Sequence, residues 1–264
     1  MRVAANLSRA MNAGELQLYF QPKVRLDTGA LDGAEALLRW NDPEHGWICP
    51  AIFIAVAEDR GMMGALGKWV LQEASRQLSV WQKSGLYFPG RLAINLSAQQ
   101  LEEADIANKF EGIVREAGLT PACFELELTE SAPMSNVEQA IETIFLMKKV
   151  GFSVAIDDFG TGYSSLTYLK RLPADTLKID IAFVRDMLKN RADRYIVTAI
   201  IGMAHHFGLK CVAEGVEEPA QAAALLELGC DEAQGYYFGR PEPAHVFAQK
   251  WLQTSRPSTA LDVA

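Results

Sequence analysis

The chain has 264 residues, of which 49% are hydrophobic and 22% are charged, and its mean hydropathy is close to zero. This composition is typical of a folded globular protein, and it excludes a largely disordered chain or one built mainly of membrane spans. The formal charge of −8 and the pI of about 5.1 exclude a polynucleotide partner, because neutralising a phosphate backbone needs a surplus of lysine and arginine.

The first third of the sequence predicts an antiparallel hairpin that is followed by two helices. Residues 16–21 and 34–40 are rich in strand-forming residues, and between them lies the turn-forming triplet Asp27-Thr28-Gly29. We treat residues 1–13 as a lead-in, residues 14–254 as one catalytic domain, and residues 255–264 as a polar, flexible tail.

From Arg91 onward, short strand-like runs alternate with amphipathic stretches, a pattern typical of βα units and a parallel sheet. Each helix is followed by a glycine, the residue that most often ends a helix. These glycines are Gly118, Gly151, Gly208 and Gly229. The predicted strands are 92–95, 124–128, 153–156, 176–179 and 210–213, and the predicted helices are 104–117, 136–150, 192–207 and 219–228.

The predicted strands number roughly eight, which favours a closed α/β barrel, although periodicity alone does not separate a barrel from an open sheet. Polar residues mark the strand ends: Asn95, Glu127, Asp157, Lys178 and Glu214 each stand at or just beyond the carboxyl end of a different predicted strand. Barrel enzymes place their chemistry at that rim. We therefore expect one site that combines these five side chains.

The strand-end groups predict a hard divalent cation. Glu35, Asn95, Glu127, Asp157 and Asp158 offer only oxygen donors, which suit Mg²⁺ or Mn²⁺ rather than zinc. Without cations the carboxylates would repel one another. Two cations sharing the adjacent Asp157 and Asp158 would polarise a phosphodiester and activate water.

An ordered set of motifs makes the sequence resemble the EAL domain family. The set covers the chain from about Gly14 to Trp251 and includes the Glu-Ala-Leu triplet for which the family is named. The motifs are Tyr19-Phe20-Gln21-Pro22, Glu35-Ala36-Leu37-Leu38-Arg39-Trp40, Asn95-Leu96-Ser97, Glu127-Leu128-Thr129-Glu130, DDFGTGYSSL from Asp157, Leu177-Lys178-Ile179-Asp180, Ala213-Glu214-Gly215-Val216-Glu217 and Gln234-Gly235-Tyr236.

This resemblance implies a modified TIM (β/α)8 barrel whose first strand is antiparallel, in agreement with the predicted hairpin. It also implies hydrolysis of the bacterial signal cyclic di-GMP (c-di-GMP) to linear pGpG, assisted by two Mg²⁺ or Mn²⁺ ions. A homodimer built partly from helices near the loop 158–166 is implied as well. Sensor or diguanylate cyclase domains often accompany EAL domains in longer proteins.

The resemblance further implies roles for single residues. Lys178 would position the attacking water, with Asp158 and Glu214 as further catalytic groups, and Glu130 would anchor the loop after Asp158. One cation would be held by Glu35, Asn95, Glu127 and Asp157, and the second by Asp157 and Asp158 with Glu214 close to it. The substrate contacts would be Gln21, Leu37, Arg39, Asp180, Glu217 and Gln234.

Two other functions stay open at this point. Some EAL domains bind c-di-GMP without cleaving it, but those usually lack several motif residues, whereas every expected ligand is present here. An unrelated metal-dependent barrel enzyme is the remoter alternative.

The sequence has no stretch of roughly 18 apolar residues that could span a membrane and no secretory leader, so we expect a cytoplasmic protein. Trp40, Trp47, Trp69 and Trp81 are expected in the core or in interfaces, and no nucleotide stacking is assigned to them.

Overall fold

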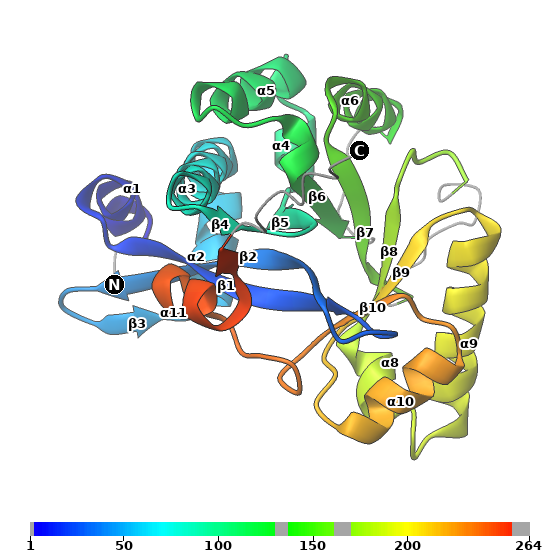
Figure 1. Cartoon of the computed structure of the whole chain (residues 1–264). Coiled ribbons are helices and arrows are strands. Elements are labelled where there is room, and N and C mark those ends of the chain that lie inside the picture. Colours follow the sequence, from blue (N-terminus) through cyan, green and yellow to red (C-terminus); the bar gives the residue numbers. More distant parts are fainter. Residues whose placement is uncertain (1–2, 130–136, 161–169, 255–264) are drawn as a thin grey trace, which may run out of the picture.

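The computed structural model describes residues 3–129, 137–160 and 170–254, and every structural statement below concerns these residues. Eight strands close into a barrel in the order β1-β10-β9-β8-β7-β6-β5-β2, with β2 pairing back onto β1 (Figure 1). Strand β1 is antiparallel to both of its barrel neighbours, whereas the other adjacent pairs are parallel. The predicted modified TIM barrel with an antiparallel first strand is confirmed.

The barrel strands are β1 (Leu16–Arg25), β2 (Leu31–Asp42), β5 (Arg91–Asn95), β6 (Phe124–Thr129), β7 (Ser153–Phe159), β8 (Thr176–Ile179), β9 (Lys210–Ala213) and β10 (Glu232–Gln234). Strands β3 (Gly46–Ile48) and β11 (Glu242–Pro243) extend the sheet, and β4 (Leu86–Tyr87) pairs with β12 (Gln253–Thr254). The helices are α1 (Val3–Ala13), α2 (Pro50–Asp59), α3 (Met63–Lys83), α4 (Ala98–Leu101), α5 (Ile106–Glu116), α6 (Val137–Val150), α8 (Ile181–Asp186), α9 (Arg191–His206), α10 (Pro219–Glu227) and α11 (Ala244–Trp251), with a 3-10 turn at Pro121–Cys123.

The predicted elements agree with the structure except at their ends and at a few short segments. Strands β8 and β9 have the predicted bounds, and the four glycines predicted to end helices all have positive φ angles. Strand β10, helix α8 and helix α11 were not predicted, because segments of three to eight residues carry too little periodicity to recognise. The lead-in is a helix, and its residues Leu7 and Ala10 are buried.

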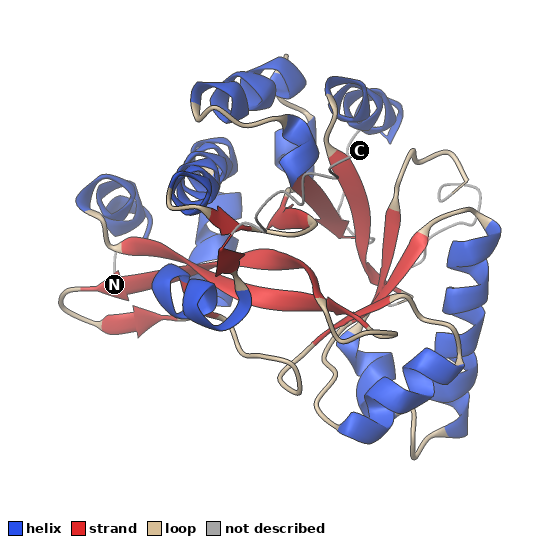
Figure 2. Ribbon diagram, viewed as in Figure 1, coloured by secondary structure: helices blue, strands red, loops and turns tan. Residues whose placement is uncertain are grey.

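The helices bury apolar faces against the outside of the barrel. Figure 2 shows helices covering the sheet on two sides, with α3 to α6 along one side and α8 to α10 along the other. One core joins α3, α5 and α6 to β5 and β6, and a second joins α8, α9 and α10 to β8 and β9. Among the described residues, no helix is long and apolar enough to cross a membrane.

The inside of the barrel is polar and is arranged in two layers. Because side chains alternate along a strand, residues two apart on one strand point to the same face. Gln21 and Lys23 on β1, Glu125 and Glu127 on β6, Thr176 and Lys178 on β8, and Glu232 and Gln234 on β10 are such pairs, and all eight are buried. In each parallel strand, the second member lies nearer the carboxyl end and belongs to the candidate site.

Candidate active site

Two consecutive carboxylates of β7 stand together because the strand is irregular where it ends. The pairing of β7 with β8 shifts register between Ile156 and Phe159, and Asp158 has a left-handed φ of +54°. The Asp158 backbone N–H donates to Asp157 Oδ1 over 2.9 Å. A regular strand would send neighbouring side chains to opposite faces, so this bulge allows both carboxylates to serve one site.

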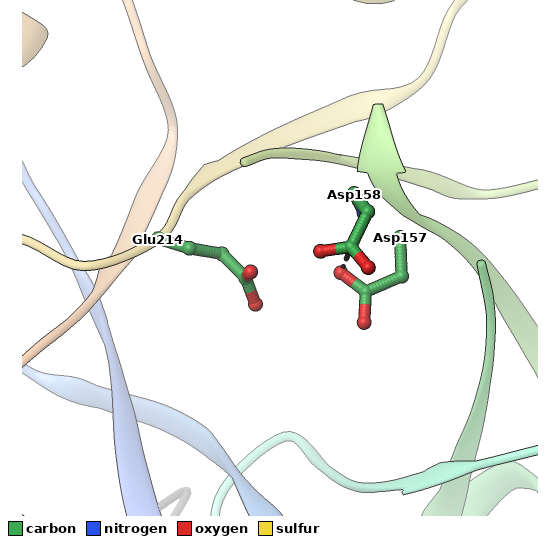
Figure 3. A group of neighbouring side chains, drawn as sticks. All are labelled: Asp157, Asp158 and Glu214. Atoms are coloured by element: carbon green, nitrogen blue, oxygen red, sulfur yellow. Dashed lines mark hydrogen bonds between the residues drawn. The ribbon is translucent and has the colours of Figure 1, made fainter. Parts of the chain in front are cut away.

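The carboxylate of Glu214, just after β9, joins this pair. Each of Asp157, Asp158 and Glu214 offers an oxygen within 4.8 Å of the other two (Figure 3). Within residues 3–129, 137–160 and 170–254, this is the one group of three or more Asp, Glu, His or Cys side chains with that geometry. These are the three residues predicted for the second cation.

The Lys178 ammonium lies among the carboxylates of three neighbouring strands. It is 2.7 Å from Glu127 Oε2, 3.0 Å from Asp157 Oδ1 and 2.7 Å from Glu214 Oε1, and the residue is 1% exposed. Burial alone would lower the pKa of Lys178, but Glu127, Glu214 and the other nearby carboxylates together raise it well above its usual value. In the metal-free fold, the surrounding carboxylates therefore favour Lys178 as a cation and a hydrogen-bond donor.

Three carboxyl groups near Lys178, those of Glu127, Asp158 and Glu214, have raised pKa values. Burial, opposed by Lys178 and reinforced by Glu35 and Asp157, holds the pKa of Glu127 well above its usual value. Burial also raises the pKa of Glu214 to about 7, and burial together with Asp157 raises that of Asp158 to about 6. Like charges crowded in a poorly solvated site produce this pattern, and a further cation would relieve it.

Glu35 belongs to a second, hydrogen-bonded group on the other side of the barrel. Asn95 Nδ2 donates to Glu35 Oε1 over 2.9 Å, and Gln234 Nε2 donates to Glu35 Oε2 over 2.6 Å. Gln234 Nε2 also donates to Gln21 Oε1 over 3.0 Å. The structure thus brings Gln21 and Gln234, two predicted substrate contacts, beside two predicted ligands of the first cation.

The donor chemistry of the site suits hard divalent cations, and the geometry gathers one group of three carboxylates, those of Asp157, Asp158 and Glu214. Among the described residues, Glu127 Oε1 and Gln234 Oε1 are buried oxygens without a hydrogen-bond partner. Buried oxygens are rarely left without a partner, so we expect a cation or a hydrogen-bond donor to bind there. The residues that could hold such cations are Glu35, Asn95, Glu127, Asp157, Asp158 and Glu214, and their donors are carboxylate and amide oxygens.

The remaining predicted site residues lie at differing depths. Leu37 and Arg39 are partly exposed on β2, where it continues beyond Glu35. Asp180 caps α8 by accepting from the Ala182 N–H over 2.6 Å, and its carboxyl group is hydrogen-bonded to that of Asp158. Glu217 is exposed. Glu130, the predicted loop anchor, and most of the loop 158–166 lie outside the described residues, so their roles stay predictions.

Sequence reasoning missed the charged layer at the other end of the barrel. Lys23 Nζ is 2.5 Å from Glu125 Oε1 and 3.9 Å from Glu232 Oε2. Thr176 Oγ1 donates to Glu125 Oε2 over 2.8 Å, and Lys210 Nζ is 2.6 Å from Glu232 Oε1. The sequence did contain a signal for this layer. On the same strand, its residues lie two positions from the predicted site residues, so both point to the same face.

Comparison with known proteins places the chain in a family. The profile of the EAL domain matches residues 4–241, nearly the whole chain. The chain is a member of the EAL domain family. This assignment agrees with the barrel topology and with the positions of the motif residues at the carboxyl ends of the parallel strands.

Relatives of this EAL domain include two proteins of Pseudomonas aeruginosa. The bifunctional diguanylate cyclase/cyclic di-GMP phosphodiesterase MucR is 41% identical over 244 residues, which are 92% of this chain and 36% of MucR. The cyclic di-GMP phosphodiesterase NbdA is 42% identical over 243 residues, which are 92% of this chain and 31% of NbdA. The chain therefore spans about a third of the length of these curated relatives.

A solved structure described as the PaMucR phosphodiesterase in complex with c-di-GMP has the same fold as this EAL domain. The two superpose with a TM-score of 0.88 at 40% sequence identity, over 94% of this chain and 100% of the other. That protein holds c-di-GMP on a barrel of the same architecture.

Proposed function

We propose that this EAL domain is a metal-dependent phosphodiesterase that hydrolyses c-di-GMP to linear pGpG. The observation that carries the proposal is the cluster in which Asp157, Asp158 and Glu214 share one space and Lys178 lies against it. The names of MucR and NbdA and the c-di-GMP complex of PaMucR support the substrate.

The proposed cofactors are two Mg²⁺ or Mn²⁺ ions. Glu35, Asn95, Glu127 and Asp157 would hold one ion, and Asp157, Asp158 and Glu214 the other. When bound, such ions withdraw electron density from a phosphodiester and favour attack by hydroxide near neutral pH. They also reconcile an acidic protein with an anionic substrate, because they reverse the local potential.

The protein's own residues supply positioning and charge. Lys178 is a cation held among three carboxylates, and it would orient the attacking water by donating to it in place of one of these partners, once a bound cation engages that carboxylate. Gln21 and Gln234, which already share a hydrogen bond, would contact the substrate beside Glu35. Arg39 would give a charge-assisted hydrogen bond to a phosphate oxygen.

Incubation of the chain with c-di-GMP and Mg²⁺ or Mn²⁺ tests the proposal, with chromatography to separate c-di-GMP, pGpG and GMP. We expect pGpG to accumulate, EDTA to stop its formation, and either ion to restore it. Glu127→Gln should abolish turnover, whereas Glu116→Gln, the same change at an exposed position on α5, should not. Restoration by zinc alone would overturn the choice of metal.

A c-di-GMP receptor without activity is the alternative that the same experiment decides. Wild-type protein that binds c-di-GMP in the presence of either ion and never yields pGpG would establish the receptor. The observation against that function is the full set of carboxylates around Lys178, since binding alone does not require a buried, charge-crowded cation site.

A further inference from the structure

Strand β2 continues beyond the barrel and forms an open wall beside the mouth of the site. Its pairing with β5 ends at Glu35 opposite Ala93, yet β2 runs on to Asp42, paired with β1 and then with β3. Figure 1 shows β2 and β3 extending away from β10 on the left of the molecule. Because β2 is parallel to β5, this extension leaves the barrel at its carboxyl end, where the candidate site lies.

One face of this wall is continuous with the candidate site. Side chains two apart on a strand share a face, so Leu37 and Arg39 lie on the same side of β2 as Glu35. Tyr19 is directly opposite Leu37 in the β1–β2 pairing, and Trp47 is opposite Asn41 in the β2–β3 pairing. At about 3.4 Å per residue, Leu37 and Tyr19 lie roughly 7 Å beyond Glu35 along the strand.

The wall presents aromatic rings and a cation to the solvent. The Tyr19 and Trp47 rings meet edge to face with centroids 5.9 Å apart, and Arg39 Cζ lies 5.6 Å from the Tyr19 centroid. Trp47 is 57% exposed, so it does not lie in the core, one of the two places expected for it. The core packs on the opposite face of the hairpin, where Leu18 and Trp40 are buried, so packing does not account for Trp47.

We propose that Tyr19 and Trp47 form a stacking subsite that holds one guanine base of the substrate, with Arg39 beside them for a phosphate oxygen. This inference rests on the proposed function, because the base comes from c-di-GMP. Aromatic rings are the groups on which proteins most often stack bases. If a phosphate of c-di-GMP binds at the carboxylates, the base of the same nucleotide can extend along β2 and reach these rings.

The affinity of Trp47 variants for c-di-GMP tests the subsite. We expect Trp47→Ala to raise the KM for c-di-GMP by about 5- to 100-fold in the presence of Mn²⁺, as for the loss of a stacked base, and to lower kcat much less. Trp47→Phe keeps a ring and should retain most of the affinity. Tyr87→Ala removes another exposed ring, 61% exposed on β4, and should behave as wild type.

Two further measurements separate the subsite from the proposed function. Mn²⁺ affinity reports on the carboxylates alone, so Trp47→Ala should leave it unchanged. Quenching of tryptophan fluorescence by c-di-GMP should be strong in the wild type and weak in Trp47→Phe, although Trp47→Phe still binds.

Wild-type affinity and KM in Trp47→Ala would overturn the subsite alone. So would an altered oligomeric state with normal kinetics, which would assign the wall to a contact between copies. Wild-type protein that neither binds nor cleaves c-di-GMP would overturn both proposals.

Discussion

The backbone at Asp158 determines the geometry of the proposed second cation site. Asp158 is one of two described non-glycine residues with positive φ, at +54°, and the other is Asp105 at +61°. Aspartate and asparagine tolerate this left-handed conformation better than most residues. Replacement by asparagine therefore changes the charge while it keeps the backbone.

Asp158→Asn should separate binding from cleavage. We expect turnover of c-di-GMP to fall by about 100-fold or more, because electrostatic stabilisation of the transition state is lost, whereas affinity should fall only modestly. Chromatography at several c-di-GMP concentrations in the presence of Mn²⁺ gives both kcat and KM, and KM follows the affinity where chemistry is slow. Asp105→Asn is the matched control, with the same change in the same backbone conformation at an exposed position. Unchanged turnover in Asp158→Asn would refute its role in holding the second cation.

Cation affinity should depend on pH through Asp158 and Glu214. Their pKa values are raised to about 6 and about 7, so in the metal-free fold both carboxyl groups bind protons at a higher pH than in the unfolded chain. That fold therefore gains stability from these groups as pH falls from about 7 toward 5. Cations must displace the same protons, so Mn²⁺ affinity should fall on acidification, approaching about tenfold per pH unit for each displaced proton. Calorimetry in buffers of different ionisation enthalpy measures the protons released, and an affinity constant from about pH 5.5 to 8 would contradict this account.

Among the elements, the four strands β1, β6, β8 and β10 each carry one residue of the site and one residue of the opposite charged layer. Glu125 and Glu127 on β6 are buried to 2% and 1% exposure, and each is within hydrogen-bond distance of a lysine. Removal of one partner from a buried ion pair leaves an uncompensated charge, which is costly. The charged layer at the other end of the barrel is therefore important for stability, although it lies outside the proposed catalytic machinery.

Lys23→Met should destabilise the fold by about 3–5 kcal/mol, because Glu125 would lose its buried partner. Adding Glu125→Gln should recover part of this loss, since the amide oxygen can still accept from Thr176 without a charge. Urea unfolding of the three proteins measures both effects. Arg76→Met, which breaks the more exposed pair with Glu73, should cost less than about 1 kcal/mol. A loss for Lys23→Met as small as that for Arg76→Met would show that the buried pair contributes little.

At the scale of the whole molecule, the homodimer implied by the family resemblance stays a prediction. Helix α6, which leads into β7, exposes Phe145 to 61% and Leu146 to 50%. Neighbouring exposed apolar side chains on one helix mark a candidate interaction surface. A dimer interface on α6 would be directly connected to β7, the strand that carries Asp157 and Asp158.

Phe145→Glu should convert the dimer to a monomer, because an interface does not bury an unpaired charge without a large cost. Light scattering gives the mass, and turnover assayed in parallel shows whether assembly and activity are coupled. Ile52→Glu, at a residue 55% exposed on α2, is the matched control and should leave the mass unchanged. A wild-type monomer with full activity at nanomolar concentration would end the prediction.

The sequence by itself indicated the βα alternation and the polar residues at strand ends, and its motifs, through the family resemblance, predicted the barrel. The βα alternation, the glycines after the helices and the polar residues at strand ends are local patterns, and β8 and β9 have the predicted bounds. Only the tertiary structure decided which of these groups touch. The insertion of Lys178 among three carboxylates and the pairing of Lys23 with Glu125 join residues from different strands, and the bulge that turns Asp158 toward Asp157 lies where the pairing of β7 with β8 shifts register. Strand β10 and the exposed position of Trp47 likewise depend on how the hairpin closes the barrel and extends beyond it. Periodicity along the chain reports the face of a side chain, but contacts between strands follow from register and barrel closure, which no local pattern encodes.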